Sequence, residues 1–112
     1  MDDVRVRILD LSGGAEDGVT EEIGPFADAE EATRFARAYV RDSLERCREP
    51  GMDARAVLDA WLAYGEDAEV VVVPIGTVWT SRAELQILAD NPADPEDRDW
   101  RSLDPRQYDL EE

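Results

Sequence analysis

The chain has 112 residues, a length that suits one domain able to bury roughly two thirds of its unfolded surface without disulfides or metals. It contains 28 acidic and 12 basic residues, giving a formal net charge of -16, and every base is an arginine. Such a charge repels nucleic acid and anionic membranes and speeds encounter with a basic surface. We therefore expect no direct nucleic-acid or membrane binding, although a halophilic or GC-rich compositional background gives the same charge without any binding role.

Missing residue types exclude several chemistries. Without histidine, the side chain whose unperturbed pKa lies nearest neutrality is not available as a base, proton shuttle or metal ligand. The absence of lysine removes Schiff-base chemistry and the phosphate-binding lysine of a P-loop. The single cysteine, Cys47, falls in register with apolar helix residues, so we interpret it as a packing residue. We predict no cofactor and assign no catalytic or metal-binding residue.

The N-terminal residues do not have the pattern of a targeting segment. The chain opens with two acids after Met1, and the short apolar alternation that follows is not a signal-peptide core. No apolar run approaches the roughly 18 residues needed to span a bilayer. We expect a soluble, cytoplasmic protein.

Two alternating segments predict an antiparallel hairpin. Val4, Val6 and Ile8 alternate with arginines, and alternation resumes over residues 19–23. Residues 12–18 between them contain three glycines and form a predicted turn.

Two helices are predicted next. Asp28 with Glu31 fits a capping box that begins a helix, and Glu49-Pro50-Gly51 stops it. Its apolar stripe consists of Ala32, Phe35, Ala36, Tyr39, Val40, Leu44 and Cys47. Asp53 caps a second helix that ends at Gly65. The predicted apolar face of this helix is Val57, Leu58, Trp61 and Leu62.

A valine-rich strand follows the helices. Residues 69–73 show no alternation, which predicts a strand covered on both faces, as an inner strand or at a subunit contact. An exposed flank of this strand would offer an edge for a homodimer. Val78 and Trp79 predict a short extended segment, and Ser81 with Glu84 fits the capping box of a third short helix.

We divide the chain into one α+β domain, residues 1–90, and an acidic, proline-containing tail, residues 91–112. The predicted fold is a two-layer sandwich in which the antiparallel hairpin and the valine strand form a sheet with two helices on one face. We expect the tail to dock on the domain through Trp100 and Leu103.

The candidate functional residues are aromatic and acidic. Tryptophan is favoured at interfaces, and Trp79 and Trp100 lie outside the regular apolar stripes. The full set of candidate partner-binding residues is Trp79, Trp100, Tyr108, Asp94, Glu96, Asp97 and Asp99. The four acids of this set lack the glycine and closing glutamate of a calcium loop. The adjacent acids Glu66 and Asp67 are expected to lie exposed in a short connector.

Three segments resemble a group of small, uncharacterised bacterial proteins. They are residues 26–32 (Phe-Ala-Asp-Ala-Glu-Glu-Ala), 51–58 (Gly-Met-Asp-Ala-Arg-Ala-Val-Leu) and 64–67 (Tyr-Gly-Glu-Asp). The resemblance implies the order strand, strand, helix, Gly-Met linker, helix, Gly-Glu-Asp, strand. Its motifs are turns and caps, so it implies no activity, ligand or catalytic residue.

Three functions remain open from the sequence. We favour a non-enzymatic acidic protein that acts by protein–protein interaction with a basic surface, because the chain has no reactive constellation. The second hypothesis is a phage- or mobile-element-type inhibitor, anti-CRISPR-like, that mimics nucleic acid and blocks a nucleic-acid-binding groove. The third is a carboxylate-based, metal-assisted enzyme that would need its acids to meet in one cleft, and these acids are Glu66, Asp67, Asp97 and Asp99.

Overall fold

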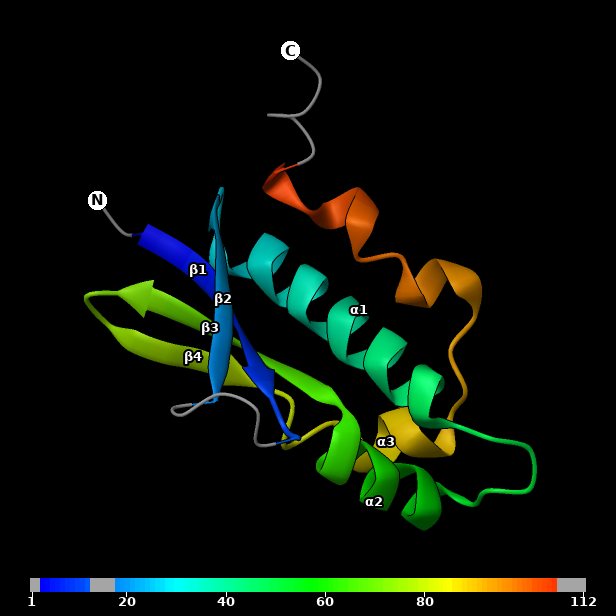
Figure 1. The fold of residues 1–112 in the computed structure, drawn as a ribbon. Helices are drawn as coiled ribbons and strands as arrows, with labels where there is room; N and C mark the ends of the chain where they lie inside the picture. Colours follow the sequence, from blue (N-terminus) through cyan, green and yellow to red (C-terminus); the bar gives the residue numbers. More distant parts are fainter. Residues whose placement is uncertain (1–2, 13–17, 107–112) are drawn as a thin grey trace.

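The computed structural model describes residues 3–12 and 18–106, which form an α+β fold with helices packed against one antiparallel sheet (Figure 1). The strands are β1 (Asp3–Asp10), β2 (Val19–Phe26), β3 (Glu66–Val73) and β4 (Gly76–Thr80). The α-helices are α1 (Ala29–Cys47), α2 (Ala54–Tyr64) and α3 (Leu85–Asp90). Two short 3-10 helices follow, η1 (Pro95–Arg98) and η2 (Arg101–Leu103). The predicted fold class is confirmed.

The strand order is β2-β1-β3-β4, so two hairpins lie side by side and α1 and α2 connect them. β1 and β3 pair without a register break, from Asp3 opposite Val73 to Asp10 opposite Glu66. The prediction that the valine strand is an inner strand is confirmed. Because β1 and β4 pair with its two sides, β3 has no free edge, and the predicted dimerisation edge on this strand is wrong.

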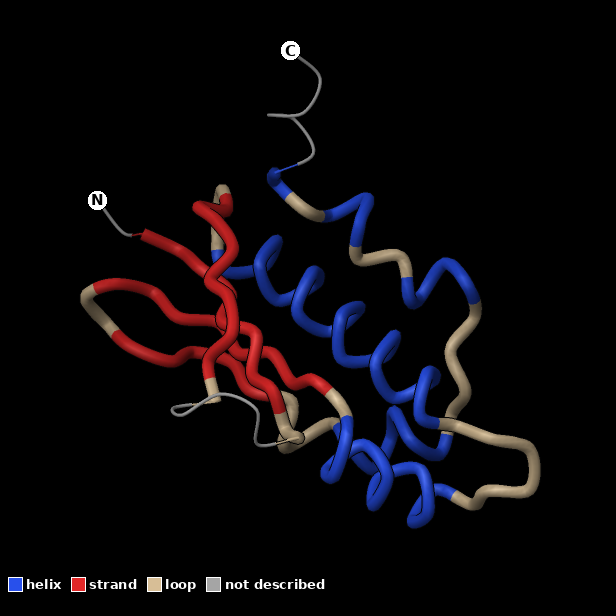
Figure 2. The backbone as a smooth tube through the Cα atoms, in the orientation of Figure 1, coloured by secondary structure: helices blue, strands red, loops and turns tan. Residues whose placement is uncertain are grey.

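One face of the sheet carries the core. α1 lies across this face (Figure 2), where alternate residues of β1 and β3 are buried against it. The inward residues are Val4, Val6, Ile8, Ala68, Val70 and Val72 from the strands and Phe35, Ala36, Val40 and Leu44 from α1. Val71 is also buried although it faces the other side, between its cross-strand neighbours Arg5 and Thr77. The valine run is therefore covered on both faces.

The predicted N-caps of α1 and α2 are both present. Asp28 Oδ1 accepts a hydrogen bond from the Glu31 N–H at 2.8 Å, and Asp53 Oδ1 accepts one from the Ala56 N–H at 2.9 Å. The predicted inward position of Leu62 is wrong, because this side chain is exposed. α2 is short and buries a narrow stripe through Val57 and Trp61, and the next residue along the helix points about 100° away from that stripe.

Gly65 ends α2 as predicted, but for a different reason from the usual one. Its φ of -87° is open to any residue, so no left-handed cap is needed. A Cβ at this position would lie 2.3 Å from Trp61 Cδ1. The glycine therefore lets the Trp61 indole pack over the start of β3, where its Nε1 donates to the Glu66 carbonyl at 3.1 Å.

The predicted cap of the third helix is wrong. α3 begins after Glu84 rather than after Ser81, and no side chain caps it. Ser81 Oγ instead donates to Asp67 Oδ1 at 2.7 Å. The Glu84 carboxylate accepts hydrogen bonds from Arg37 and from Trp79 Nε1. Contacts with β3, β4 and α1 thus occupy both residues of the expected capping box.

The tail lies along α1 and bridges it to β2. The Trp100 ring packs edge-on against Phe35, with 5.9 Å between the ring centroids, and lies tilted against Tyr39, with 5.0 Å between centroids. Leu103 packs against the same core. At the end of the described part of the tail, Arg106 forms an ion pair with Glu21 of β2.

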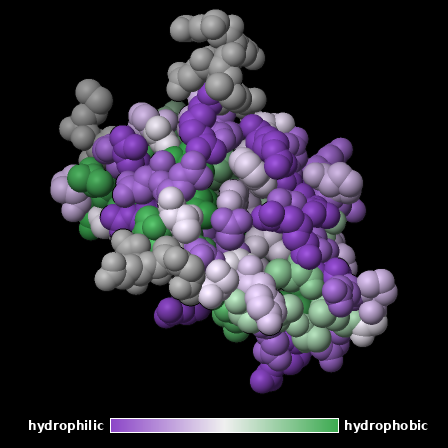
Figure 3. Space-filling view, in the orientation of Figure 1, coloured by the Kyte–Doolittle hydropathy of each residue, from purple (hydrophilic) through white to green (hydrophobic). Residues whose placement is uncertain are grey.

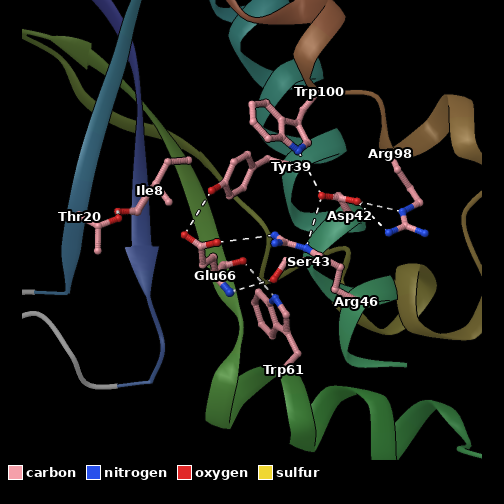
Figure 4. A network of polar contacts seen from close by, with 10 residues as sticks. All are labelled: Ile8, Thr20, Tyr39, Asp42, Ser43, Arg46, Trp61, Glu66, Arg98 and Trp100. Carbon is pink, nitrogen blue, oxygen red and sulfur yellow. Dashed lines mark hydrogen bonds and ion pairs between the residues drawn. The ribbon is translucent and has the colours of Figure 1, made fainter. Parts of the chain in front are cut away.

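Asp42 of α1 is the main polar anchor of the tail (Figure 4). Its side chain is only 14% exposed and accepts hydrogen bonds from Arg98 Nε at 2.9 Å and Trp100 Nε1 at 3.2 Å. Arg46 lies between two carboxylates, 3.5 Å from that of Asp42 and 3.6 Å from that of Glu66.

None of the helices in the described ranges is long and apolar enough to cross a membrane.

Replacing Asp42 with alanine is expected to lower the free energy of unfolding by about 1–3 kcal/mol, because Arg98 and Trp100 lose a partly buried acceptor. Urea denaturation measures this loss. The matched control is Asp59→Ala, which removes an exposed acid that pairs with the exposed Arg55. A change within about 0.5 kcal/mol is expected. Equal losses in the two variants would contradict the anchoring role of Asp42.

Candidate functional site

The three aromatic residues predicted to contact a partner lie in different surroundings. Trp100 packs on α1 and holds the tail against the domain. Tyr108 lies outside the described residues. Trp79 on β4 is half-buried, with Arg37 5.8 Å from the centre of its ring. Trp79 lines a hollow together with Val78 and the first turns of α1.

The tail acids mostly hold the tail itself together. Asp97 Oδ2 accepts from the backbone N–H of Asp94 at 3.1 Å and lies 3.5 Å from Arg41 Nη2. Asp99 accepts from the Ser102 hydroxyl at 2.6 Å. Glu96 is exposed. Within the described ranges, no three or more His, Cys, Asp or Glu residues are grouped to hold a metal ion.

The four acids of the enzyme hypothesis do not meet in one cleft. Glu66 faces α1, where its carboxylate accepts from Tyr39 Oη at 3.2 Å. Burial and then the charge of Glu66 raise the pKa of Tyr39 to about 12. Asp67 lies on the opposite side of β3 and contacts Ser81, while Asp97 and Asp99 are on the tail.

Cys47 lies at the end of the α1 stripe and is partly buried. Burial raises the pKa of its thiol, and the neighbouring charge of Arg46 opposes this shift without cancelling it. The thiolate, the reactive form, is therefore disfavoured at this position.

A pocket of about 260 Å³ lies where the ends of β1, β3 and β4 meet α2 and α3. Its apolar lining is Leu9, Leu11, Trp61, Leu62 and Leu85. Its polar lining is Asp67, Glu69, Thr80, Ser81 and Arg82. Half of the lining is apolar and half is polar, so the pocket offers both apolar and charged contacts to a ligand.

Asp67 is the unusual side chain of this pocket. Its Oδ1 accepts two hydrogen bonds, from Ser81 Oγ at 2.7 Å and from the Ala68 N–H at 2.8 Å. Burial raises the pKa of Asp67, and these hydrogen bonds and the charge of Arg82 only partly offset the rise. The prediction that Glu66 and Asp67 lie exposed in a short connector is wrong, because both belong to β3 and are partly buried. No local pattern indicates the contact of Asp67 with Ser81, 14 positions away.

The second unusual surface is the end of the β3–β4 hairpin, which extends past α1 (Figure 1). Three large apolar side chains are exposed there, Val73 at 50%, Ile75 at 70% and Val78 at 46%. In the same orientation, hydrophobic atoms interrupt the mostly hydrophilic surface at the hairpin end, on the left of Figure 3. We call residues 73–78 the hairpin tip.

Asp67→Asn is expected to stabilise the protein near neutral pH and to have little effect in acid. The pKa of Asp67 is raised in the folded state, so its contribution to stability is present below its ordinary value of 3.8 and is lost as pH rises through the folded-state pKa. Urea denaturation at about pH 7 and about pH 3 measures both limits. A variant that is less stable than the wild type only near pH 7 would contradict the burial effect, and Asp59→Asn serves as the exposed control.

Comparison with protein-family models, curated proteins and solved structures found no match. No family or relative therefore assigns a function to the chain, and the resemblance over residues 26–73 stays a prediction. The two surfaces that offer chemistry to another molecule are the hairpin tip and the Asp67 pocket.

Proposed function

We propose that the protein acts without catalysis, by binding a protein partner through the hairpin tip, and that positive charge surrounds the contact on the partner. The observation that carries the proposal is the clustering of exposed apolar side chains. Of the six large hydrophobic residues that are exposed in the described part of the chain, three fall within residues 73–78. Clustered exposed hydrophobic residues are a mark of interaction sites, whereas single ones are ordinary.

The surroundings of the tip suit a docked chain. β4 is an edge strand, so its outer backbone groups are placed to pair with an added strand. Next to it lies a hollow of about 520 Å³ between β4 and the first turns of α1. Val78 and Trp79 line this hollow together with Arg34 and Arg37 of α1. A partner on the tip therefore has an aromatic contact within reach.

Charge favours a basic partner. The net charge is -16, and at least nine of the 12 arginines form ion pairs with the protein's own carboxylates. They are Arg5, Arg7, Arg37, Arg41, Arg46, Arg48, Arg55, Arg98 and Arg106. The excess carboxylates attract a positive surface over long range and speed association. The apolar tip then supplies contact area that salt does not screen.

The test is affinity capture from a lysate of the source organism, with the wild-type protein and two variants as baits. Val78→Ser combined with Ile75→Ser removes apolar area from the tip and is expected to weaken retention of the partner by about tenfold or more. Ile87→Ser is the matched control, because Ile87 is 63% exposed on α3 away from the tip. It is expected to retain the partner as the wild type does.

Salt and nucleic acid separate the remaining hypotheses in the same experiment. A partner bound through the tip is expected to be retained in part at high salt, because the apolar contact persists when charges are screened. A complex that DNA or RNA displaces and that the tip substitutions leave intact would contradict the proposal and favour the nucleic-acid mimic. A bait that retains no stoichiometric partner at any salt concentration would also contradict it.

A further inference from the structure

The Asp67 pocket lies at the opposite end of β3 from the hairpin tip, and tip binding does not use it. We propose that this pocket binds an organic cation, an ammonium or guanidinium group on an aliphatic stem. The inference is independent of the proposed function. Two sources share this chemistry, a free small amine and a lysine or arginine side chain of a partner protein.

One carboxylate oxygen of Asp67 accepts no hydrogen bond from the described residues. Asp67 Oδ1 is occupied by Ser81 and Ala68, whereas Oδ2 accepts no hydrogen bond from the described residues. Oδ2 is also not among the buried atoms without a partner in that part of the chain, so it has some exposure to solvent, and Asp67 lines the pocket. No arginine of the described ranges lies within 4.0 Å of Asp67 to neutralise it.

The other charged groups around Asp67 leave its charge available. Glu69, two residues along the same strand, lies 3.7 Å from Arg7 of β1. Arg82 lies at the pocket and acts on Asp67 through its charge alone. A partly buried carboxylate gains more from a close cation than an exposed one does, because water screens the interaction less.

The apolar walls and the volume of the pocket indicate the stem and the size of the ligand. Leucine side chains from β1, α2 and α3 and the Trp61 ring suit the methylene groups of an aliphatic stem, which pack on apolar surface while the charged end stays polar. A pocket of about 260 Å³ is small for a drug-sized molecule and suits one long side chain or a small amine. Because binding needs ionised Asp67, affinity is expected to fall as pH drops through the raised pKa of this group.

The first arm of the test is an NMR titration with n-butylammonium and n-butylguanidinium chloride at constant ionic strength. Saturable shifts are expected at the Trp61 indole N–H and the backbone N–H of Ala68, which report on the pocket wall and on Asp67. Asp67→Asn keeps the shape of the side chain and the Oδ1 atom that accepts both hydrogen bonds. It removes the negative charge and places an N–H donor where Oδ2 was, so it is expected to weaken binding by about tenfold or more. Arg82→Gln removes a like charge and is expected to strengthen it, a change of opposite sign that a purely structural role would not produce.

Controls separate cation binding from general effects. n-Butanol has the stem without the charge and is expected to give no saturable shift at these positions. Asp59→Asn removes an exposed carboxylate of α2 and is expected to leave the affinity for the butyl cations unchanged. Saturable binding of the butyl cations that is equal in wild type and Asp67→Asn, or equal shifts with butanol, would overturn the proposal.

The second arm identifies the source of the cation. Asp67→Asn is compared with wild type as bait for the captured partner, and a loss of retention assigns the pocket to a partner's side chain. Unchanged retention, together with amine binding in the first arm, assigns it to a free amine. If neither the butyl cations nor the partner distinguish wild type from Asp67→Asn, the pocket proposal fails, whereas loss of binding on tip substitution still supports the hairpin proposal.

Discussion

The packing of α1 across β1 and β3 is the interaction on which the rest of the structure depends. One long helix buries the alternate valines and isoleucines of the two central strands, so the apolar core lies on a single side of the sheet. On the opposite side of the sheet, Val71 is buried between its cross-strand neighbours, and the two ends of β3 differ from each other. At one end is the apolar hairpin tip, and at the other α2 and α3 enclose the Asp67 pocket.

The distribution of charge explains how an acidic tail docks on an acidic domain. Two tail acids, Asp97 and Asp99, are satisfied within or beside the tail, while the contact with the domain uses the bases Arg98 and Arg106 and the ring of Trp100. The domain supplies a matching acid on each element, Asp42 on α1 and Glu21 on β2. Unlike charges therefore meet at the contact, although the net charges of the two parts have the same sign.

Local patterns made the main elements predictable from the sequence. The cap at Asp28, the α1 stripe and the alternation of β1 depend on neighbours within a few residues, so spacing alone indicates them. The uninterrupted valines of β3 likewise indicate burial on both faces. Periodicity does not show which strand pairs with which, so the full participation of β4 in the sheet appears only in the structure.

Tertiary contacts decided the features that sequence analysis missed. Ser81 and Glu84 have the spacing of a capping box, yet Asp67 and Arg37 compete for their side chains across 14 and 47 positions of the chain. The pocket unites residues from β1, β3, β4, α2 and α3, and no local pattern reports that convergence. Among the candidate tail acids, Asp97 contacts Arg41 and Asp99 accepts from Ser102, while Glu96 is exposed. No local pattern predicts the exposed hairpin tip.

The central claim is that a protein partner binds the hairpin tip and not the side of the sheet that the helices cover. Hydrogen–deuterium exchange of the protein, free and in the captured complex, tests it most directly, because each backbone amide reports its own protection. The account predicts added protection over residues 73–80 and unchanged exchange over residues 94–103. Protection of the tail with an unchanged hairpin would contradict the account and place binding on the acidic segment.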